Sequence, residues 1–289
     1  MEQTRIITRN SASNLALAFV LLPREKRGGM SALYAFCREV DDVADDESVP
    51  VEDRRRSLAE WREDVRLACE GGNPRFPVNQ ELQPVIRQYN LSFDHFDALI
   101  KGVEMDLEIN RYPDYEQLEI YCYRVASVVG LLSIEIFGYK DAACRNYAIY
   151  LGKALQLTNI LRDVRCDAER GRIYLPFSEL SRFHVTEEEI LRHDYSVRFY
   201  QLAASVAKRA RHFYSLARTT LPSADRRSMR AAELMGSVYW RLLRKLERGR
   251  FDVFGPKPTR LNKGQKMLLI FRALCRFAFG TVSPSYGTP

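Results

Sequence analysis

The sequence predicts an all-α protein built as a single domain. Apolar residues recur at spacings of three and four along most of the chain, which is the period of amphipathic helices. Alternating runs bounded by Gly or Asn-Gly turns, which are typical of strands, are hard to find. Since a chain of 289 residues can bury roughly 75% of its unfolded surface, we expect one large helical core.

Proline and glycine residues divide the chain into helical segments in order. The breaks fall at Pro50, 71–74 with Pro77, 112–113, Gly138, Pro176, Pro222 and 255–258. None is long enough to be a flexible linker between domains. We therefore expect an all-helical domain over residues 1–281 and a frayed, disordered tail over residues 282–289.

Composition excludes several classes of protein. With 46% hydrophobic and 28% charged residues, the chain is neither disordered, collagen-like nor a disulfide-stapled miniprotein. A net charge of +7 favours an anionic partner. Nucleic acid is not the expected one, because no binding signature for it accompanies the charge. The six cysteines lack C-x-x-C spacing, which favours reduced thiols in a cytosolic protein over a zinc site.

An uncharged stretch near the start, Asn10 to Pro23, has 14 residues, fewer than the roughly 20 needed to cross a bilayer. A charged run follows it instead of a small-residue cleavage site. We therefore expect no cleaved signal peptide.

A dense acidic cluster, with five carboxylates within residues 41–47, ends the first strongly patterned helix, from Pro23 to about Asp45. One flank of this helix carries Tyr34, Arg38, Asp41 and Asp45. The carboxylates of Asp41 and Asp45 are expected to lie roughly 6 Å apart, close enough to bind Mg²⁺ together. The alternative is a solvated acidic helix end.

A second polar stripe lies on a helix near residue 160. It consists of Ala148, Gly152, Gln156, Asn159, Asp163 and Asp167. A solvated face would carry Lys, Glu and Arg, whereas this one runs from small residues through amides to carboxylates. It resembles the wall of a cavity that is apolar at one end and metal-binding at the other. The alternative is an amide-rich buried helix with a charged exit.

Two acidic stripes that face each other across a cavity can hold several Mg²⁺ ions, and these can activate a diphosphate leaving group. Guanidinium groups beside the clusters can complete the phosphate contacts. They belong to Arg38, Arg162, Arg170 and Arg172. The apolar remainder of the cavity can then hold a long hydrocarbon tail.

At these motifs the chain resembles the squalene/phytoene synthase family of head-to-head prenyltransferases. The resemblance rests on LLP at 21–23, ALYAFCREVDDVAD at 32–45, YCYRVASVVG at 121–130, QLTNILRDV at 156–164, RGRIYLP at 170–176 and FDVF at 251–254. Within the family, the Val-Ala-Ser variant and the segment at 130–138 are most like bacterial presqualene diphosphate synthases of hopanoid pathways.

The resemblance implies an isoprenoid synthase fold with a central cavity, and a role for each matching residue. It makes Asp41, Asp45, Asn159, Asp163 and Asp167 ligands of Mg²⁺. It assigns Tyr121 to the reacting carbons and proton removal, and it places Arg38, Tyr239 and a basic C-terminal residue, Lys263 or Lys266, near the diphosphates. It places Val125, Ala126, Val129, Gly130, Leu155 and Gln156 along the prenyl tunnel. The chain departs from many relatives at Ser13-Asn14-Leu15, where they carry Ser-Ser-Phe, and no role is assigned there.

The implied reaction joins two farnesyl diphosphates to presqualene diphosphate and releases diphosphate. The alternatives are a phytoene synthase acting on two geranylgeranyl diphosphates and a catalytically silent assembly factor of the same fold. No G-x-G-x-x-G motif follows a strand, so downstream pathway enzymes are expected to perform any reductive step.

A basic and apolar segment, from Lys263 to Phe279, lies near the end of the chain. It fits a core helix with a solvated basic edge. It also fits peripheral attachment to a membrane, which suits a lipophilic product. The expected location is the cytoplasm, with contact at the inner face of the membrane.

Overall fold

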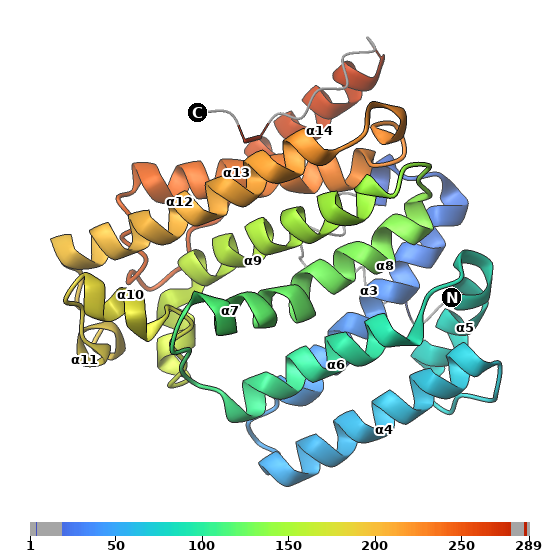
Figure 1. The fold of residues 1–289 in the computed structure, drawn as a ribbon, viewed down its shortest axis with the longest axis horizontal. Helices are drawn as coiled ribbons and strands as arrows, with labels where there is room; N and C mark the ends of the chain where they lie inside the picture. The colour runs from blue at the N-terminus through green and yellow to red at the C-terminus, as the bar shows by residue number, and fades with distance from the viewer. Residues whose placement is uncertain (1–3, 5–18, 279–285, 288–289) are drawn as a thin grey trace.

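The computed structural model describes residues 4, 19–278 and 286–287, so Ser13-Asn14-Leu15 and most of the early uncharged stretch lie outside the described residues. The elements are η1 (Phe19–Leu21), α3 (Arg24–Asp45), α4 (Val51–Glu70), α5 (Pro77–Tyr89), α6 (Phe93–Glu108), α7 (Tyr115–Cys122), η2 (Tyr123–Ser127), α8 (Val128–Phe137), α9 (Ala143–Glu169), α10 (Phe177–Arg182), α11 (Glu187–Leu191), α12 (Val197–Thr220), η3 (Ser223–Asp225), α13 (Arg230–Arg248) and α14 (Lys263–Ala278) (Figure 1).

The all-α prediction is confirmed. Within the described residues there is no β-strand, and one isolated bridge joins Arg111 to Ile173. The predicted breaks also fall between helices. Pro50 caps the start of α4 and Gly71, with φ of 82°, caps its end. Gly138 ends α8 with φ of 74°, a conformation that glycine adopts without a Cβ clash.

The helices form a layered bundle around α9. Figure 1 shows α4 and α6 on one side, the continuous rod of α7, η2 and α8 in the middle, and α9, α12 and α13 on the other side. The apolar stripe of α9, from Ala154 through Leu157 and Leu161 to Val164, is buried, and α12 is the most extensive neighbour of α9. The opposite face of α9 is therefore left to form a cavity with α3, α8 and α13.

A π-helical turn, Tyr123–Ser127, interrupts the rod between α7 and α8. Beside it, α9 approaches so closely that a Cβ on Gly152 would lie 2.5 Å from the Ser127 Cα. Gly152, predicted as part of a small-residue cavity wall, therefore also has a packing role, because no larger residue fits between these two backbones.

The rod Tyr115–Phe137 is long and apolar enough to span a membrane by length and composition alone. More than half of its most apolar window is buried inside the bundle. It lies between α6 and α9, which is the position of a core helix (Figure 1).

Within the expected tail, Tyr286 is fully buried. Its hydroxyl donates a hydrogen bond to Glu233 Oε1, and its ring packs against that of Tyr214. A buried phenol with a buried carboxylate as acceptor ties this residue to α13. The remaining residues of the expected tail lie outside the described residues, apart from Gly287, and the division at residue 281 stays a prediction.

Candidate active site

A cavity of about 300 Å³ lies between α3, the rod, α9 and α13. Twelve of the residues predicted from the sequence line it, namely Tyr34, Asp41, Val125, Ala126, Val129, Gly130, Ala148, Gly152, Leu155, Gln156, Asn159 and Tyr239. Most other lining side chains are apolar, among them Phe19, Leu99, Ile134, Phe137 and Met235. The predicted combination of an apolar wall with amide and carboxylate groups is thus present in one cavity.

Acidic side chains gather where three helices end. Asp41 and Asp45 lie in the last turns of α3, Asp106 in the last turn of α6, and Asp163 and Asp167 near the end of α9. None of the three helices carries a basic residue in its last turn. Since the C-terminal end of a helix dipole is negative, carboxylates there add to an unfavourable field. This end of the bundle therefore favours bound cations.

On α3, the residues of the predicted stripe have different surroundings in the structure. Asp41 faces the cavity; burial by the surrounding protein and the charge of Asp45 raise the pKa of its carboxyl group to about 7. Arg38 does not pair with either residue, because its guanidinium binds Asp42 Oδ1 at 2.6 Å on the outer side. Asp45 lies 3.3 Å from Arg170 Nη1 and 3.3 Å from Arg172 Nη1.

On α9, the three predicted oxygen ligands also differ in their surroundings. Asn159 Oδ1 is buried and has no hydrogen-bond partner among the described residues. Asp163 accepts hydrogen bonds from Nε and Nη2 of the adjacent Arg162, and the bond from Nε is 2.7 Å long. Burial and the charge of Asp163 raise the pKa of Asp167 to about 8. Tyr239 reaches Arg162 from α13, so this arginine links α9 to the cavity wall.

Asp106 is a site residue that the sequence interpretation missed. Its Oδ1 accepts a hydrogen bond of 2.6 Å from the Tyr174 hydroxyl, and its Oδ2 accepts one of 3.0 Å from Tyr121. Burial raises the pKa of Asp106 to about 6, although both hydroxyls and Arg172 oppose the shift. The Tyr174 ring stacks on those of Tyr112 and Tyr121, and the three ring centroids lie 5.2 to 5.8 Å apart, which fixes the two donors.

The oxygen donors at this end fit Mg²⁺. Within the described part of the chain, no three His, Cys, Asp or Glu side chains converge tightly enough to bind a metal by themselves. Mg²⁺ usually takes one or two carboxylates and completes its shell with water and substrate phosphates. The unpartnered Asn159 Oδ1 and the crowded Asp41 and Asp167 are suitable oxygen donors for such an ion.

The structure does not bring every predicted residue to the cavity. Lys263 is exposed at the first residue of α14 and is not among the residues lining the cavity. Tyr121 is buried beside Asp106 and lies one helical turn before the lining residue Val125. The diphosphate contact of Lys263 therefore stays a prediction.

An all-helical bundle with an apolar cavity that leads to carboxylates and arginines defines the isoprenoid synthase class. The squalene/phytoene synthase family model matches residues 8–265. The chain belongs to this family, and it is thus a head-to-head prenyltransferase of isoprenoid biosynthesis.

Individual relatives agree with this assignment. The chain is 36% identical over 264 residues to the presqualene diphosphate synthase of Rhodopseudomonas palustris, a match that covers 90% of this chain and 92% of the relative. It is 35% identical over 271 residues to the phytoene synthase of Arthrospira platensis, covering 89% and 86%. The crystal structure of a dehydrosqualene synthase in complex with a ligand superposes with a TM-score of 0.85 at 28% identity, covering 96% and 95%.

Proposed function

We propose that this protein condenses two farnesyl diphosphates to presqualene diphosphate in a Mg²⁺-dependent reaction. The single observation that carries the proposal is the cavity itself, which joins an apolar wall to the gathered carboxylates and arginines. The similarity to the presqualene diphosphate synthase of Rhodopseudomonas palustris supports this choice of product.

The cavity wall is long enough for a farnesyl tail. Tyr147 is the lining residue of α9 farthest from Asn159, twelve positions away, so the wall runs for about 18 Å. At roughly 1.25 Å per bond, an extended farnesyl tail reaches about 14 Å and a geranylgeranyl tail about 19 Å. The farnesyl tail therefore fits between the metal end and Tyr147 with room to spare.

Asp41, Asp45, Asn159, Asp163 and Asp167 would hold Mg²⁺ together with substrate oxygens. Bound Mg²⁺ would supply positive charge that stabilises the departing diphosphate. The guanidinium groups of the arginines nearby bind and orient the phosphate oxygens. These are Arg162, Arg170 and Arg172.

Loss of the donor diphosphate leaves an allylic cation, which the double bond of the acceptor attacks. The apolar wall keeps water from quenching the cation. Loss of one proton then closes the cyclopropane. The net reaction converts two farnesyl diphosphates into presqualene diphosphate, one diphosphate and one proton.

Tyr121 and Asp106 can receive that proton as a pair, with the released diphosphate as the other acceptor. Burial and the charge of Asp106 raise the pKa of Tyr121 well above its usual range, so the phenol remains protonated at neutral pH. When the substrate proton arrives at Tyr121 Oη, the phenolic proton can pass to Asp106 Oδ2 along their hydrogen bond. Asp106 is thus a positioning residue that makes the phenol basic enough to act.

The test uses purified protein with Mg²⁺ and either farnesyl or geranylgeranyl diphosphate, without a nicotinamide cofactor, and identifies the product by mass. Presqualene diphosphate from farnesyl diphosphate is the expected result. Phytoene from the longer substrate would select the second candidate, which the similarity to a phytoene synthase supports. Absence of turnover with both substrates would favour a catalytically silent assembly factor.

A further inference from the structure

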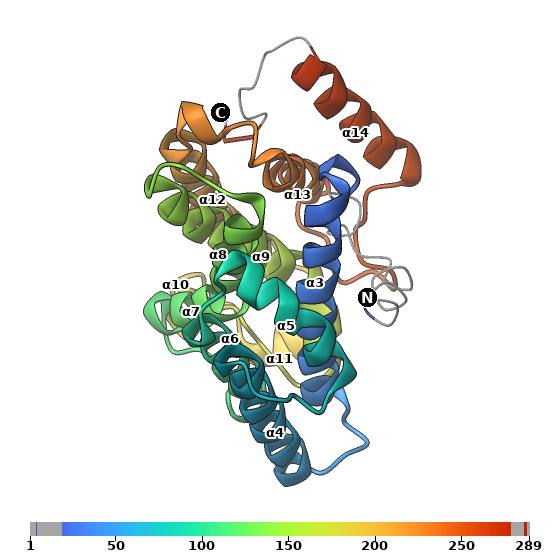
Figure 2. The same ribbon diagram turned by 90° about the vertical axis from the view of Figure 1, so that its right-hand side faces the viewer.

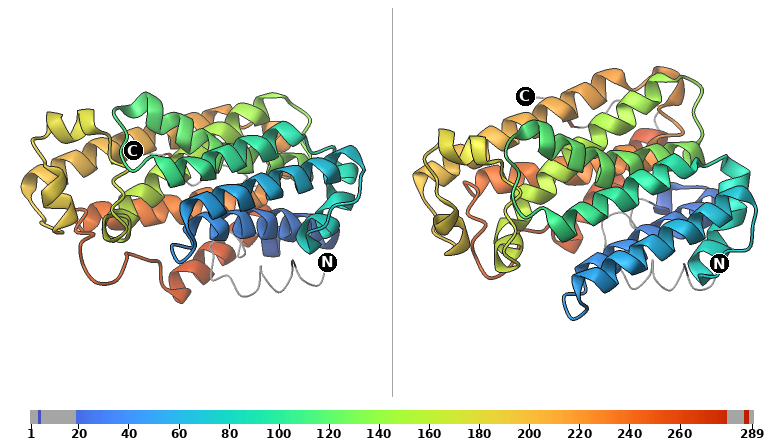
Figure 3. Two further views of the ribbon diagram at one scale, coloured as in Figure 1. Left: turned by 90° about the horizontal axis from the view of Figure 1, so that it is seen from below. Right: turned by 60° about the horizontal axis from the view of Figure 1, so that its bottom comes forward.

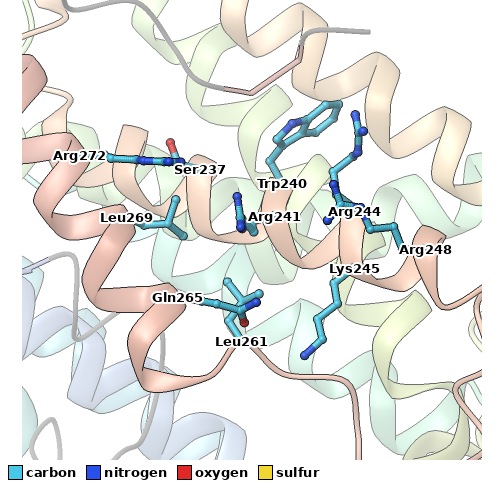
Figure 4. A pocket seen from close by; sticks show the side chains of 10 residues that line it. All are labelled: Ser237, Trp240, Arg241, Arg244, Lys245, Arg248, Leu261, Gln265, Leu269 and Arg272. Atoms are coloured by element: carbon cyan, nitrogen blue, oxygen red, sulfur yellow. The ribbon is translucent and has the colours of Figure 1, made fainter.

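A second concave site, here called the basic groove, lies between α13 and α14 on the side of α13 away from the cavity. It has a volume of about 490 Å³. Figure 4 shows side chains of α13 and α14 approaching each other across it, with Arg241 on α13 and Arg272 on α14. The remaining basic residues in its lining are Arg244, Lys245 and Arg248.

The charges in the basic groove are largely uncompensated. No carboxylate is among its described lining residues. Among the described residues, the carboxylate in contact with a groove cation is that of Glu247, whose Oε2 lies 3.6 Å from Arg244 Nε. This carboxylate already accepts hydrogen bonds of 2.6 Å from Nε and Nη2 of Arg211. The ion pairs found for α13 among the described residues join Glu247 to Arg211 and Arg244, and none involves Arg241 or Arg248. The groove is therefore suited to a ligand that carries several negative charges.

The helix that forms the outer wall of the groove exposes apolar side chains. Leu269 packs inward against the core, whereas Met267, Leu268 and Phe271 are 61%, 41% and 64% exposed. Figures 2 and 3 show α14, in red, at the periphery of the bundle. Large exposed apolar side chains next to a cationic groove form the pattern of a helix that lies at a membrane interface.

We propose that the basic groove and the exposed face of α14 dock the protein on an anionic lipid bilayer. The cations bind the phosphate groups of lipid headgroups, while Met267 and Phe271 enter the boundary between headgroups and acyl chains. The apolar face distinguishes this ligand from a free phosphate ion, which would leave that face in water. Such a contact is consistent with the location expected from the sequence, at the inner face of the membrane.

The docking site lies directly behind the wall of the cavity. The inner side of α13 contributes Met235 and Tyr239 to the cavity, while its outer side contributes Arg241 and Arg244 to the basic groove. One helix thus separates the reaction from the bilayer. This inference does not depend on which prenyl diphosphate is the substrate.

The test measures co-sedimentation with vesicles of phosphatidylcholine alone and with vesicles that also contain phosphatidylglycerol, at low and at physiological ionic strength. We expect binding only to the anionic vesicles, weakened by salt. Near a membrane each cation contributes about 1 kcal/mol, so Arg241→Gln/Arg248→Gln is expected to weaken binding about 30-fold. The matched control, Arg192→Gln/Lys208→Gln, removes two exposed charges elsewhere and should bind like the wild type.

A second variant, Met267→Ser/Phe271→Ser, keeps every groove cation and changes only exposed side chains, so the fold should remain intact and vesicle binding should fall. Circular dichroism and activity in detergent should match the wild type for all variants. Equal binding by the groove variant and the wild type would overturn the proposal. So would saturable binding of inorganic phosphate, or of RNA, by a protein that does not bind anionic vesicles.

Discussion

Asp106→Asn tests the proton-accepting pair most directly. The carboxylate accepts two hydrogen bonds, and the one from Tyr174, at 2.6 Å, is shorter than the 3.0 Å bond from Tyr121. An amide keeps one acceptor oxygen and replaces the other with a donor. The Asp106→Asn variant should therefore retain the bond from Tyr174, and the Tyr121 hydroxyl should lose its acceptor.

The size of the effect follows from the bond that is lost. A hydrogen bond to a charged group contributes about 1.5–3 kcal/mol, which corresponds to a rate loss of about 10- to 150-fold. We expect kcat to fall by this factor with little change in KM, because neither residue lines the cavity wall that holds the tail. The assay is diphosphate release in the presence of Mg²⁺ and farnesyl diphosphate.

A double-mutant cycle separates a functional pair from two unrelated defects. If Asp106 acts through Tyr121, then Asp106→Asn/Tyr121→Phe should be no slower than the worse single variant, within about threefold. Tyr112→Phe is the matched control, because its ring belongs to the same stack and its buried hydroxyl has no hydrogen-bond partner among the described residues. The paired role would be refuted if the rate loss of the double variant equalled the product of the two single losses. Near-normal turnover of Asp106→Asn would refute it as well.

Three further changes test the rest of the site and its scaffold. Asp163→Asn should lower turnover at least about 100-fold, as measured by product formation, if metal activation contributes several kcal/mol. The pKa values of Asp41 and Asp167 are raised to about 7 and about 8, so between about pH 4 and pH 8 the folded state binds more protons than the unfolded state. Without Mg²⁺, the contribution of these two protonated carboxyl groups to the free energy of unfolding should be complete below about pH 4 and should be lost as the pH rises to about 8. In thermal unfolding, Mg²⁺ should therefore raise Tm more at high pH than at low pH. Gly152→Ala should lower the free energy of unfolding in urea by about 1–3 kcal/mol, because the new Cβ meets the Ser127 backbone.

Each of these tests has a control on the same chain. Asp46→Asn alters an exposed carboxylate that bonds only to Ser48 nearby, and full activity is expected. Asp167→Asn should flatten the pH dependence of Tm in the metal-free protein. Gly249→Ala places a Cβ no closer than 3.5 Å to its neighbours and should leave stability unchanged. Equal destabilisation by both glycine variants would contradict the packing role of Gly152.

Patterns within one helix could be predicted from the sequence, while contacts between helices could not. The spacing of Tyr34 and Asp41, or of Gln156 and Asn159, is fixed by helical geometry, and the structure places all four in one cavity. Asp106 has no acidic neighbour on its helix face that would form a stripe like those of α3 and α9, so its role appears only where α6 meets α7 and Tyr174.

Two other differences have separate physical origins. The pairing of Arg38 with Asp42 follows i, i+4 geometry within one helix, where Asp42 is an alternative partner to the diphosphate that the resemblance implied for Arg38. Tyr286 stands among Ser, Pro and Gly residues that favour a loose end, and only Glu233, far away in sequence, provides the buried acceptor for its hydroxyl.

The π turn at Tyr123–Ser127 determines how the side chains of α7 are rotated about the helix axis relative to those of α8. A π turn contains one residue more than an α turn, so its loss would rotate α7 by roughly 100° relative to α8. Tyr121 would then turn away from Asp106 while Val129 still faced the cavity. Deletion of a single residue here would thus change the orientation of the proton-accepting group relative to the tail-binding wall, although the residues of both would be unchanged. The length of this short segment therefore matters as much as its side chains.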